Sequence, residues 1–359
     1  MDTFGKAAFV TEADPIDANF KPQQYERAQL FNFVKTELEA VMNQLKPART
    51  NEFGRVDKAV AQMILAKVYL NAEVYIGQNM YSDCRLLCED IIASGYTLAT
   101  NYLNNFNADN STNEAAQKEI IFALQADGTN TKSYGPTTVM INGEVGYVEQ
   151  NGASLGVGAS GWGGALRVRS QFSQKFEDSA FDMDARNTIL SQARPIRVTD
   201  IADKATGYIV TKYSNRSSTG VAGPNSTFVD TDFPLFRLAD VYLMYAECVL
   251  RGGGGTNALA LQYVNALRTR ANNGSTAHNI SGSDLTLNFI LDERGRELYW
   301  ESHRRQDLIR FGKFTGGSYN WDWKGNAPAG IALPEHMKVY PLPTNSLASN
   351  PNLTQNTGY

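Results

Sequence analysis

Four pairs of carboxylate residues lie close together in the sequence and could do acid–base chemistry. They are Glu177 with Asp178, Asp182 with Asp184, Asp230 with Asp232, and Glu293 with Glu297. Two carboxyl groups held about 5 Å or about 7–9 Å apart are the arrangement that cleaves a glycosidic bond. With 37 Asp and Glu residues in the chain, however, such pairs arise by chance. Glycoside hydrolysis is therefore a minor hypothesis.

The other catalytic residue types form no recognisable set. His303, one of three histidines, lies in a charged segment that is predicted to be helical. On a single helix, Ser302, His303 and Asp307 cannot line up as nucleophile, base and orienting carboxylate. The sequence also lacks the signatures of α/β-hydrolases, zinc peptidases, P-loops and dinucleotide-binding folds. The acids and bases of residues 293–310 are better explained as ion pairs along and between helices, and no enzyme activity is predicted.

Two polar stretches, residues 109–113 and 230–232, are rich in side-chain oxygen atoms. Asp109, Asp230 and Asp232 could share a hard cation such as calcium, which takes oxygen ligands. Neither stretch has the spacing of an EF-hand loop. Asx turns and helix caps explain the same residues without a metal, and this is the simpler interpretation.

Two isolated aromatic residues stand out in the glycine-rich, polar segment 126–165. Tyr134 precedes Gly135 and Pro136, and Trp162 follows Gly161. The segment is too broken by glycine to be predicted as a helix or a long strand. A large ring on such a loop either fills the core or offers a flat face to a ligand such as a sugar, whose C–H faces stack on aromatic rings. From the residues alone, core filling is the simpler interpretation.

Composition excludes several classes of protein. The 33 basic and 37 acidic residues are balanced, and no Lys/Arg run stands out, so nucleic-acid binding is not predicted. Cys84 and Cys88 share a helix face and, like Cys248, are expected to be buried rather than paired or bound to zinc. No stretch of about 18 apolar residues predicts a transmembrane helix. The first residues lack a signal-peptide pattern, which predicts either a cytoplasmic protein or an absent true N-terminus.

The elements that must position these residues are mostly helices. Helices are predicted over 23–46, 58–76, 81–94, 168–178, 235–251, 256–272 and 285–311, and strands over 119–124 and 208–213.

Two of the predicted helices resemble each other. Residues 65–73 resemble residues 238–247, and a second helix follows each of them. This repetition is typical of tetratricopeptide-like helical hairpins, although chance similarity between apolar helices is the alternative. The predicted fold class is therefore mainly α, with helical hairpins in an α-α superhelix, loop-rich insertions and a few short strands.

Several motifs resemble those of the SusD/RagB family. They are the sequence from Phe53 to Ala59, that from Leu65 to Ala72, that from Phe233 to Asp240, that from Arg296 to Gly312, and Tyr340-Pro-Leu-Pro343. The resemblance covers essentially the whole chain. It implies one domain, 1–359, made of a helical-repeat half (20–125), glycan-facing loops (126–225) and a C-terminal helical segment (226–359).

The resemblance also implies a function and a location. Members of this family are outer-membrane lipoproteins that capture nutrients at the cell surface for a TonB-dependent transporter. Ser133-Tyr-Gly135, Gly161-Trp162 and the segment 319–325 resemble the starch-binding members. Tyr134 and Trp162 are then expected to belong to an aromatic arc that follows an α-glucan, with Arg167 orienting hydroxyl groups. This favours the ligand platform over core filling, whereas Trp321 and Trp323 are assigned to packing.

The same resemblance carries expectations about what the chain lacks. It corresponds to the C-terminal two-thirds of family members, so the lipidated cysteine is expected to be absent, with membrane contact only through that missing anchor. Asp230 and Asp232 match acids of a family calcium site, but Ser111 stands where a further acid is expected. No cofactor is required, and calcium would be structural. The alternative function is a helical-repeat interaction subunit of an uptake complex that captures a different glycan.

Overall fold

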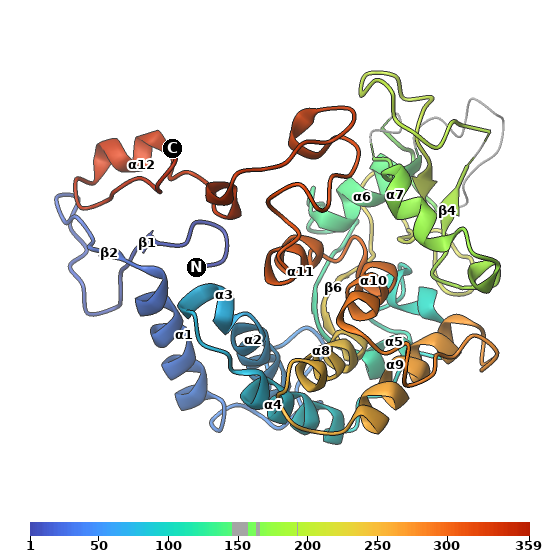
Figure 1. Cartoon of the computed structure of the whole chain (residues 1–359), viewed down its shortest axis with the longest axis horizontal. Coiled ribbons are helices and arrows are strands. Elements are labelled where there is room, and N and C mark those ends of the chain that lie inside the picture. Colours follow the sequence, from blue (N-terminus) through green and yellow to red (C-terminus); the bar gives the residue numbers. More distant parts are fainter. Residues whose placement is uncertain (146–156, 163–165, 192) are drawn as a thin grey trace.

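The computed structural model describes residues 1–145, 157–162, 166–191 and 193–359, and it is mainly helical, as predicted (Figure 1). The α-helices are α1 (Arg27–Val41), α2 (Lys58–Leu70), α3 (Ala72–Ile76), α4 (Tyr81–Ala93), α5 (Glu114–Glu119), α6 (Pro136–Val145), α7 (Ser170–Ser173), α8 (Leu238–Leu250), α9 (Asn257–Ala271), α10 (Leu287–Leu298), α11 (Arg304–Arg310) and α12 (Thr344–Ser349). The strands are β1 (Ala7–Ala8), β2 (Gln24–Tyr25), β3 (Ile120–Leu124), β4 (Ile189–Leu190), β5 (Ile209–Val210) and β6 (Phe233–Arg237).

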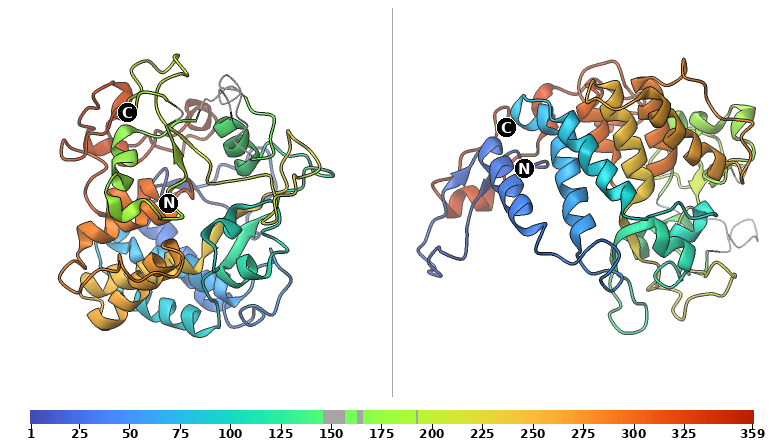
Figure 2. Two further views of the ribbon diagram at one scale, coloured as in Figure 1. Left: turned by 90° about the vertical axis from the view of Figure 1, so that its right-hand side faces the viewer. Right: turned by 90° about the horizontal axis from the view of Figure 1, so that it is seen from below.

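Helical hairpins form the larger part of the fold. Helices α2 and α4 form one hairpin and α8 and α9 another, and α4 packs against both α2 and α8. The two similar sequence segments lie on α2 and α8, so they occupy equivalent places on either side of α4. Figure 2 shows these helices side by side. The predicted tetratricopeptide-like arrangement is confirmed, although its two units are far apart in the sequence.

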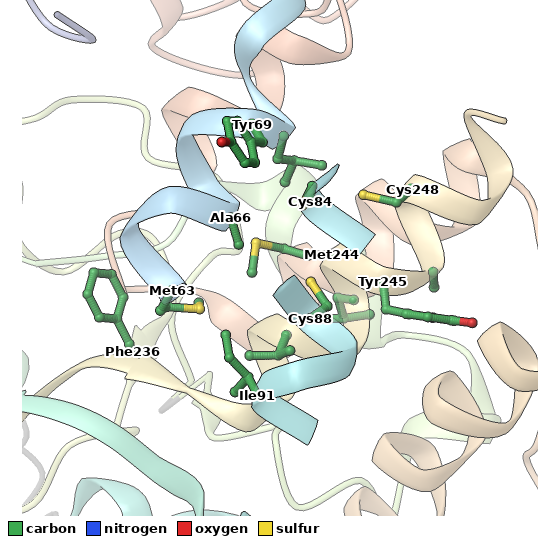
Figure 3. Close-up of a cluster of buried hydrophobic side chains, with 14 of the residues drawn as sticks. Met63, Ala66, Tyr69, Cys84, Cys88, Ile91, Phe236, Met244, Tyr245 and Cys248 are labelled. Atoms are coloured by element: carbon green, nitrogen blue, oxygen red, sulfur yellow. The ribbon is translucent and has the colours of Figure 1, made fainter. Parts of the chain in front are cut away.

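The core between the hairpins is made of aromatic, sulfur-containing, aliphatic and small side chains (Figure 3). Ala66 on α2 has no exposed surface, which lets the neighbouring helix approach closely. Cys84, Cys88 and Cys248 are free and fully buried, as predicted. Burial raises the pKa of the Cys84 and Cys88 thiols, so these residues act as small apolar groups rather than as nucleophiles.

The prediction of one helix over 285–311 is wrong. Helix α10 ends at Leu298, and α11 begins at Arg304. Trp300 and Ser302 between them have left-handed backbone conformations, with φ of 59° and 66°. Helical periodicity continues through this sequence, but the two positive φ angles turn the chain. His303 therefore lies at the turn and not inside a continuous helix.

A network of buried ion pairs joins α10 to the rest of the molecule. Glu297 Oε1 accepts hydrogen bonds from Arg237 Nη1 at 2.6 Å and from Arg270 Nη2 at 2.5 Å. Glu293 Oε1 accepts one from Arg186 Nη1 at 2.8 Å. These groups are almost completely buried, so removal of one partner would leave an uncompensated charge in the core. The predicted ion pairs between elements are thus confirmed.

The sheet formed by β3 and β6 sets the position of two loops. The strands are antiparallel, with Ile120 opposite Arg237 and Leu124 opposite Phe233. Strand β3 was expected from its apolar run, whereas residues 235–237 of β6 were assigned to the following helix. The pairing places the loop after Leu124 beside the loop before Phe233. Tyr134 belongs to the first of these loops, and Asp230 and Asp232 belong to the second.

The N-terminal segment and the C-terminal tail are joined by hydrogen bonds. Gln24 Nε2 donates a hydrogen bond to Thr354 Oγ1 at 3.0 Å, and Asn356 Nδ2 donates one to the carbonyl of Phe4 at 2.9 Å. Figure 1 shows the tail crossing the molecule to reach β1 and β2. The two ends of the chain therefore form one edge of the fold.

Candidate functional site

The two loops beside the β3–β6 sheet come into backbone contact at Gly128. A Cβ atom at this position would lie 2.1 Å from the carbonyl oxygen of Phe228, so only glycine fits. The Gly128 N–H donates to Asp230 Oδ1 at 2.7 Å. Asp127 then stabilises the next turn by accepting from the backbone N–H groups of Thr129 and Asn130. This contact fixes the path of the chain that leads to Tyr134.

Helix α6 follows Tyr134 directly, which corrects the expectation that segment 126–165 contains no helix. Pro136 is its first residue, where the missing proline N–H leaves no intrahelical bond unmade. Residues 136–142 contain no glycine, and the Val139 N–H donates to the carbonyl of Gly135. Glycine is frequent over the whole segment but clusters outside this run. The helix therefore provides a rigid base beside Tyr134.

A buried amide, Asn142, ties this helix to the loop that carries Trp162. Its Oδ1 accepts from the Gly161 N–H at 3.2 Å, and its Nδ2 donates to the carbonyl of Thr227 at 2.8 Å. The Trp162 N–H also donates to the Asn142 carbonyl at 2.9 Å. Three segments that are distant in the sequence are therefore joined at one fully buried side chain.

A second buried amide, Asn215, joins the loop that carries Trp162 to the loop that carries Phe228. Its Nδ2 donates to the carbonyls of Gly158 and Asn225 at 2.9 and 2.8 Å. Its Oδ1 accepts from the Asp230 N–H at 3.1 Å. A Cβ on Gly158 would lie 2.7 Å from the Asn215 carbonyl oxygen, so this approach also requires glycine. The loops around Trp162 and Phe228 are thus held by hydrogen bonds.

These loops bring three aromatic rings into a row. The ring centroids of Tyr134 and Trp162 are 5.9 Å apart, and those of Tyr134 and Phe228 are 4.9 Å apart. Tyr134 is 66% exposed and Trp162 is 39% exposed, so neither ring fills the core. The plane of the Tyr134 ring is inclined by 62° to that of Phe228 and by 49° to that of Trp162, so the rings face in different directions. Such an array can stack against the apolar faces of a ring-shaped ligand.

Sequence reasoning missed three residues of this site. Phe228 is the third ring, and Asn142 and Asn215 hold the loops. The signal that identified Tyr134, an isolated aromatic in a polar stretch, applies also to Phe228 in Ser226-Thr-Phe-Val. No comparable signal marks the two asparagines, because their partners are distant in the sequence.

Arg167 follows Trp162 by five residues, and its guanidinium is bound to backbone carbonyls. Its guanidinium donates to the backbone carbonyls of Ile201, Asp203 and Thr206, at distances between 2.6 and 3.0 Å. It holds the 201–206 loop and lines a cavity whose described walls do not include the three rings. A role in orienting ligand hydroxyl groups remains a prediction.

The three acids predicted to share calcium do not form a carboxylate cluster. Asp109 accepts from the backbone and side chain of Ser218. Within the described residues, no group of three or more His, Cys, Asp or Glu side chains could hold a metal ion. Asp232 Oδ1 accepts from the Ala126 N–H, but its buried Oδ2 has no hydrogen-bond partner in the part of the chain that the structure describes. Burial raises the pKa of Asp232 to about 6, and the charge of Asp230 adds to this effect.

One candidate pair of catalytic acids is accounted for by the fold. Glu293 and Glu297 are fully buried and bound to arginine side chains. Burial disfavours their charged forms, but the neighbouring arginines lower the pKa of both carboxyl groups below the usual range. They remain ionised at neutral pH and lack the raised pKa of a general acid.

Comparison with known proteins defines the class of this fold and site. The SusD family model matches residues 93–359, so the chain belongs to the SusD family. It is 32% identical to the starch-binding protein SusD of Bacteroides thetaiotaomicron, with 100% of this chain and 70% of that protein covered. It is 28% identical to the SusD-like protein P25 of Formosa agariphila, covering 85% of this chain and 60% of that protein.

Solved structures confirm the fold. A SusD homolog from Bacteroides thetaiotaomicron has a TM-score of 0.76 at 19% identity, covering 100% of this chain and 75% of that one. The surface glycan-binding protein A of the same species, in complex with laminarihexaose, has a TM-score of 0.68 at 22% identity. That similarity covers 93% of this chain and 72% of the other. At these identities the similarity extends to the fold alone.

Proposed function

We propose that this protein binds starch-like α-glucan oligosaccharides without catalysis and delivers them to a TonB-dependent outer-membrane transporter. The observation that carries the proposal is the row formed by the exposed rings of Tyr134 and Trp162 and the half-buried ring of Phe228. Sugars stack on such rings, while polar groups in the surrounding loops bind their hydroxyls. The similarity to a relative named as starch-binding supports the choice of α-glucan.

The cellular setting is part of the same proposal. The protein would act at the outer surface of the outer membrane beside a SusC-like partner, with the loops of segment 126–225 and Phe228 facing the glycan. None of the helices in the described residues is both long and apolar enough to cross a membrane. A lipid anchor of the kind that the family resemblance implies would provide the contact with the membrane.

Affinity electrophoresis tests the glycan-binding proposal. The purified chain is run in native gels that contain amylopectin, pullulan, dextran, inulin, xyloglucan or laminarin. Retardation by amylopectin is expected, and Trp162→Ala and Tyr134→Ala should each weaken binding by about 1–3 kcal/mol, the typical contribution of one stacked ring. Tyr359→Ala removes another exposed ring, at the end of the chain, and should leave the retardation unchanged.

Different outcomes test the assignment of the site and the assignment of the ligand. Retardation that Trp162→Ala and Tyr134→Ala leave intact would contradict the site. Absence of retardation by amylopectin, from a folded protein, would contradict the α-glucan assignment. Retardation by laminarin alone would support the alternative function, capture of a different glycan by an interaction subunit. The structural relative solved with laminarihexaose gives that alternative its basis.

We also propose a structural calcium site, with two of the three predicted acids as its ligands. Asp230 and Asp232 would hold the cation, because Asp232 Oδ2 is buried without a hydrogen-bond partner among the described residues. Asp109 is occupied by Ser218 and is not part of this pair. Added calcium should raise the melting temperature of the wild type relative to EGTA, but not that of Asp232→Asn. Equal melting temperatures of the wild type in calcium and EGTA would remove the metal from the proposal.

A further inference from the structure

The molecule also contains a cavity whose described lining residues do not include the three rings. It is a cavity of about 470 Å³ between the segment 167–172, helices α10 and α11, and the loop 314–333. Its walls combine apolar side chains, including Phe172, Leu298 and Leu333, with an excess of cationic groups. The cavity is large enough for a small ring compound.

The cationic groups around this cavity exceed the acids. Arg167, Arg169, Arg294, Arg304 and Lys324 line it, whereas Asp307 is the single carboxylate among the described residues of its wall. Asp307 is bound to Arg294 and Arg310 at 2.9 and 2.8 Å, so its charge is already neutralised. His303 also lines the cavity, but burial and the charge of Lys67 lower its pKa to about 4, so it is neutral.

Lys324, Arg304 and Arg169 lack an ion-pair partner among the described residues. The Lys324 ammonium, on a residue that is 8% exposed, donates to the backbone carbonyls of Tyr319 and Lys313. Burial, together with the charge of Arg169, lowers the pKa of Lys324. Arg304 donates to a backbone carbonyl and to the Tyr319 hydroxyl. Lys324 and Arg169 repel each other beside a partly apolar space, and an anion bound near them would relieve this repulsion.

The acids nearest to these cations are occupied. Asp322 attracts Arg169 but accepts hydrogen bonds from Ser170, Gln171 and Arg197. Asp292 is paired with Lys175. Among the described residues, the cations around the cavity therefore outnumber the acids that could neutralise them.

Aromatic rings give the cavity a preference for a ring-shaped ligand. Tyr319 and Trp321 are stacked, with centroids 4.8 Å apart, and both line the cavity. Trp321 had been assigned to packing, and its stacking with Tyr319 is consistent with that role. Its half-buried indole also forms part of the wall. Trp323 does not line the cavity and donates instead to the Val198 carbonyl.

We propose that this cavity binds an acidic saccharide unit, a sugar ring that carries a carboxylate. The carboxylate would lie among Arg169, Arg304 and Lys324, and the ring would lie against Trp321 and the neighbouring apolar groups. This site goes beyond the proposed α-glucan platform. Arg167 lines this second site rather than the first.

Intrinsic tryptophan fluorescence tests the proposal, because Trp300 and Trp321 line the cavity. Digalacturonate should change the emission in a saturable way, whereas neutral digalactose should not. Arg169→Gln and Arg304→Gln should each weaken digalacturonate binding about tenfold, because each removes a hydrogen bond to a charged group. Affinity should also fall as salt is raised. Arg55→Gln, which alters a cation outside the cavity, should bind as the wild type does.

Several results would overturn the proposal. These are equal binding of the acidic and neutral sugars, no binding of digalacturonate, or wild-type affinity in Arg169→Gln. Inorganic sulfate competing as tightly as digalacturonate would exclude recognition of the sugar ring. Arg169 is exposed and makes no ion pair with any described residue, so its variant is expected to fold, and thermal unfolding checks this. Trp162→Ala should retain digalacturonate binding, which separates this site from the α-glucan platform.

Discussion

At the scale of single residues, the site depends on buried amides more than on its rings. Tyr134 and Trp162 are exposed and make few polar contacts of their own. Asn142 makes the hydrogen bonds that fix where the ring of Trp162 lies relative to α6. A residue of this kind acts on the ligand through the position of another side chain. Its contribution can therefore be separated from direct stacking.

Asn142→Ala should weaken amylopectin binding almost as much as Trp162→Ala, although Asn142 is fully buried. The variant leaves the Gly161 N–H and the Thr227 carbonyl without their partner, which costs roughly 1–3 kcal/mol of stability. Binding is measured by affinity electrophoresis and stability by denaturant unfolding. Asn19→Ala, on an exposed loop, is the control for loss of an amide. Wild-type retention by Asn142→Ala would exclude the positioning role.

At the scale of elements, the β3–β6 pair and Gly128 bring two loops together. The strand pairing sets the register, and the close backbone approach at Gly128 fixes the spacing. An added methyl group at this position has no space, because the obstacle is a backbone carbonyl and not a flexible side chain.

Gly128→Ala should therefore displace the loop that leads to Tyr134 and weaken glucan binding. Overpacking of this kind typically costs about 1–3 kcal/mol of stability. Gly282→Ala is a matched control, because its new Cβ meets nothing within 4 Å. The two variants are compared by thermal unfolding and by retention on amylopectin. Identical behaviour of both would show that the close contact at Gly128 does not constrain the site.

At the scale of the whole molecule, buried charges join the helical hairpins to α10 and α11. Burial would raise the pKa of Glu293 and Asp307, but neighbouring arginines lower both values to about 2. Their stabilising effect is complete above the unfolded pKa of about 4 and is lost as pH falls toward 2. His303 acts in the same direction, because its pKa is lowered to about 4 and the unfolded state binds the proton first as pH falls. Of these four groups, Asp232 alone has a raised pKa, so its contribution to stability increases as pH falls.

The free energy of unfolding should therefore fall by roughly 3–6 kcal/mol between pH 7 and pH 3. Urea unfolding at several pH values measures this change. Glu297→Gln should lower stability at pH 7 by about 3–5 kcal/mol, because it leaves buried arginines without a full counter-charge. Glu52→Gln, at an exposed ion pair, should change stability little. A pH-independent unfolding free energy would contradict the role assigned to the network.

The sequence by itself determined the helical hairpins, strand β3, the buried cysteines and the family. These features follow from local periodicity, from the small and large side chains within one helix, and from contiguous motifs. Tertiary structure alone decided that α2 and α8 flank α4, that the chain turns at Trp300 and Ser302, and that Phe228 joins Tyr134 and Trp162. It also decided that Arg167 binds carbonyls and that an excess of cations surrounds a cavity. Each depends on contacts between distant residues, which no local pattern in the chain encodes.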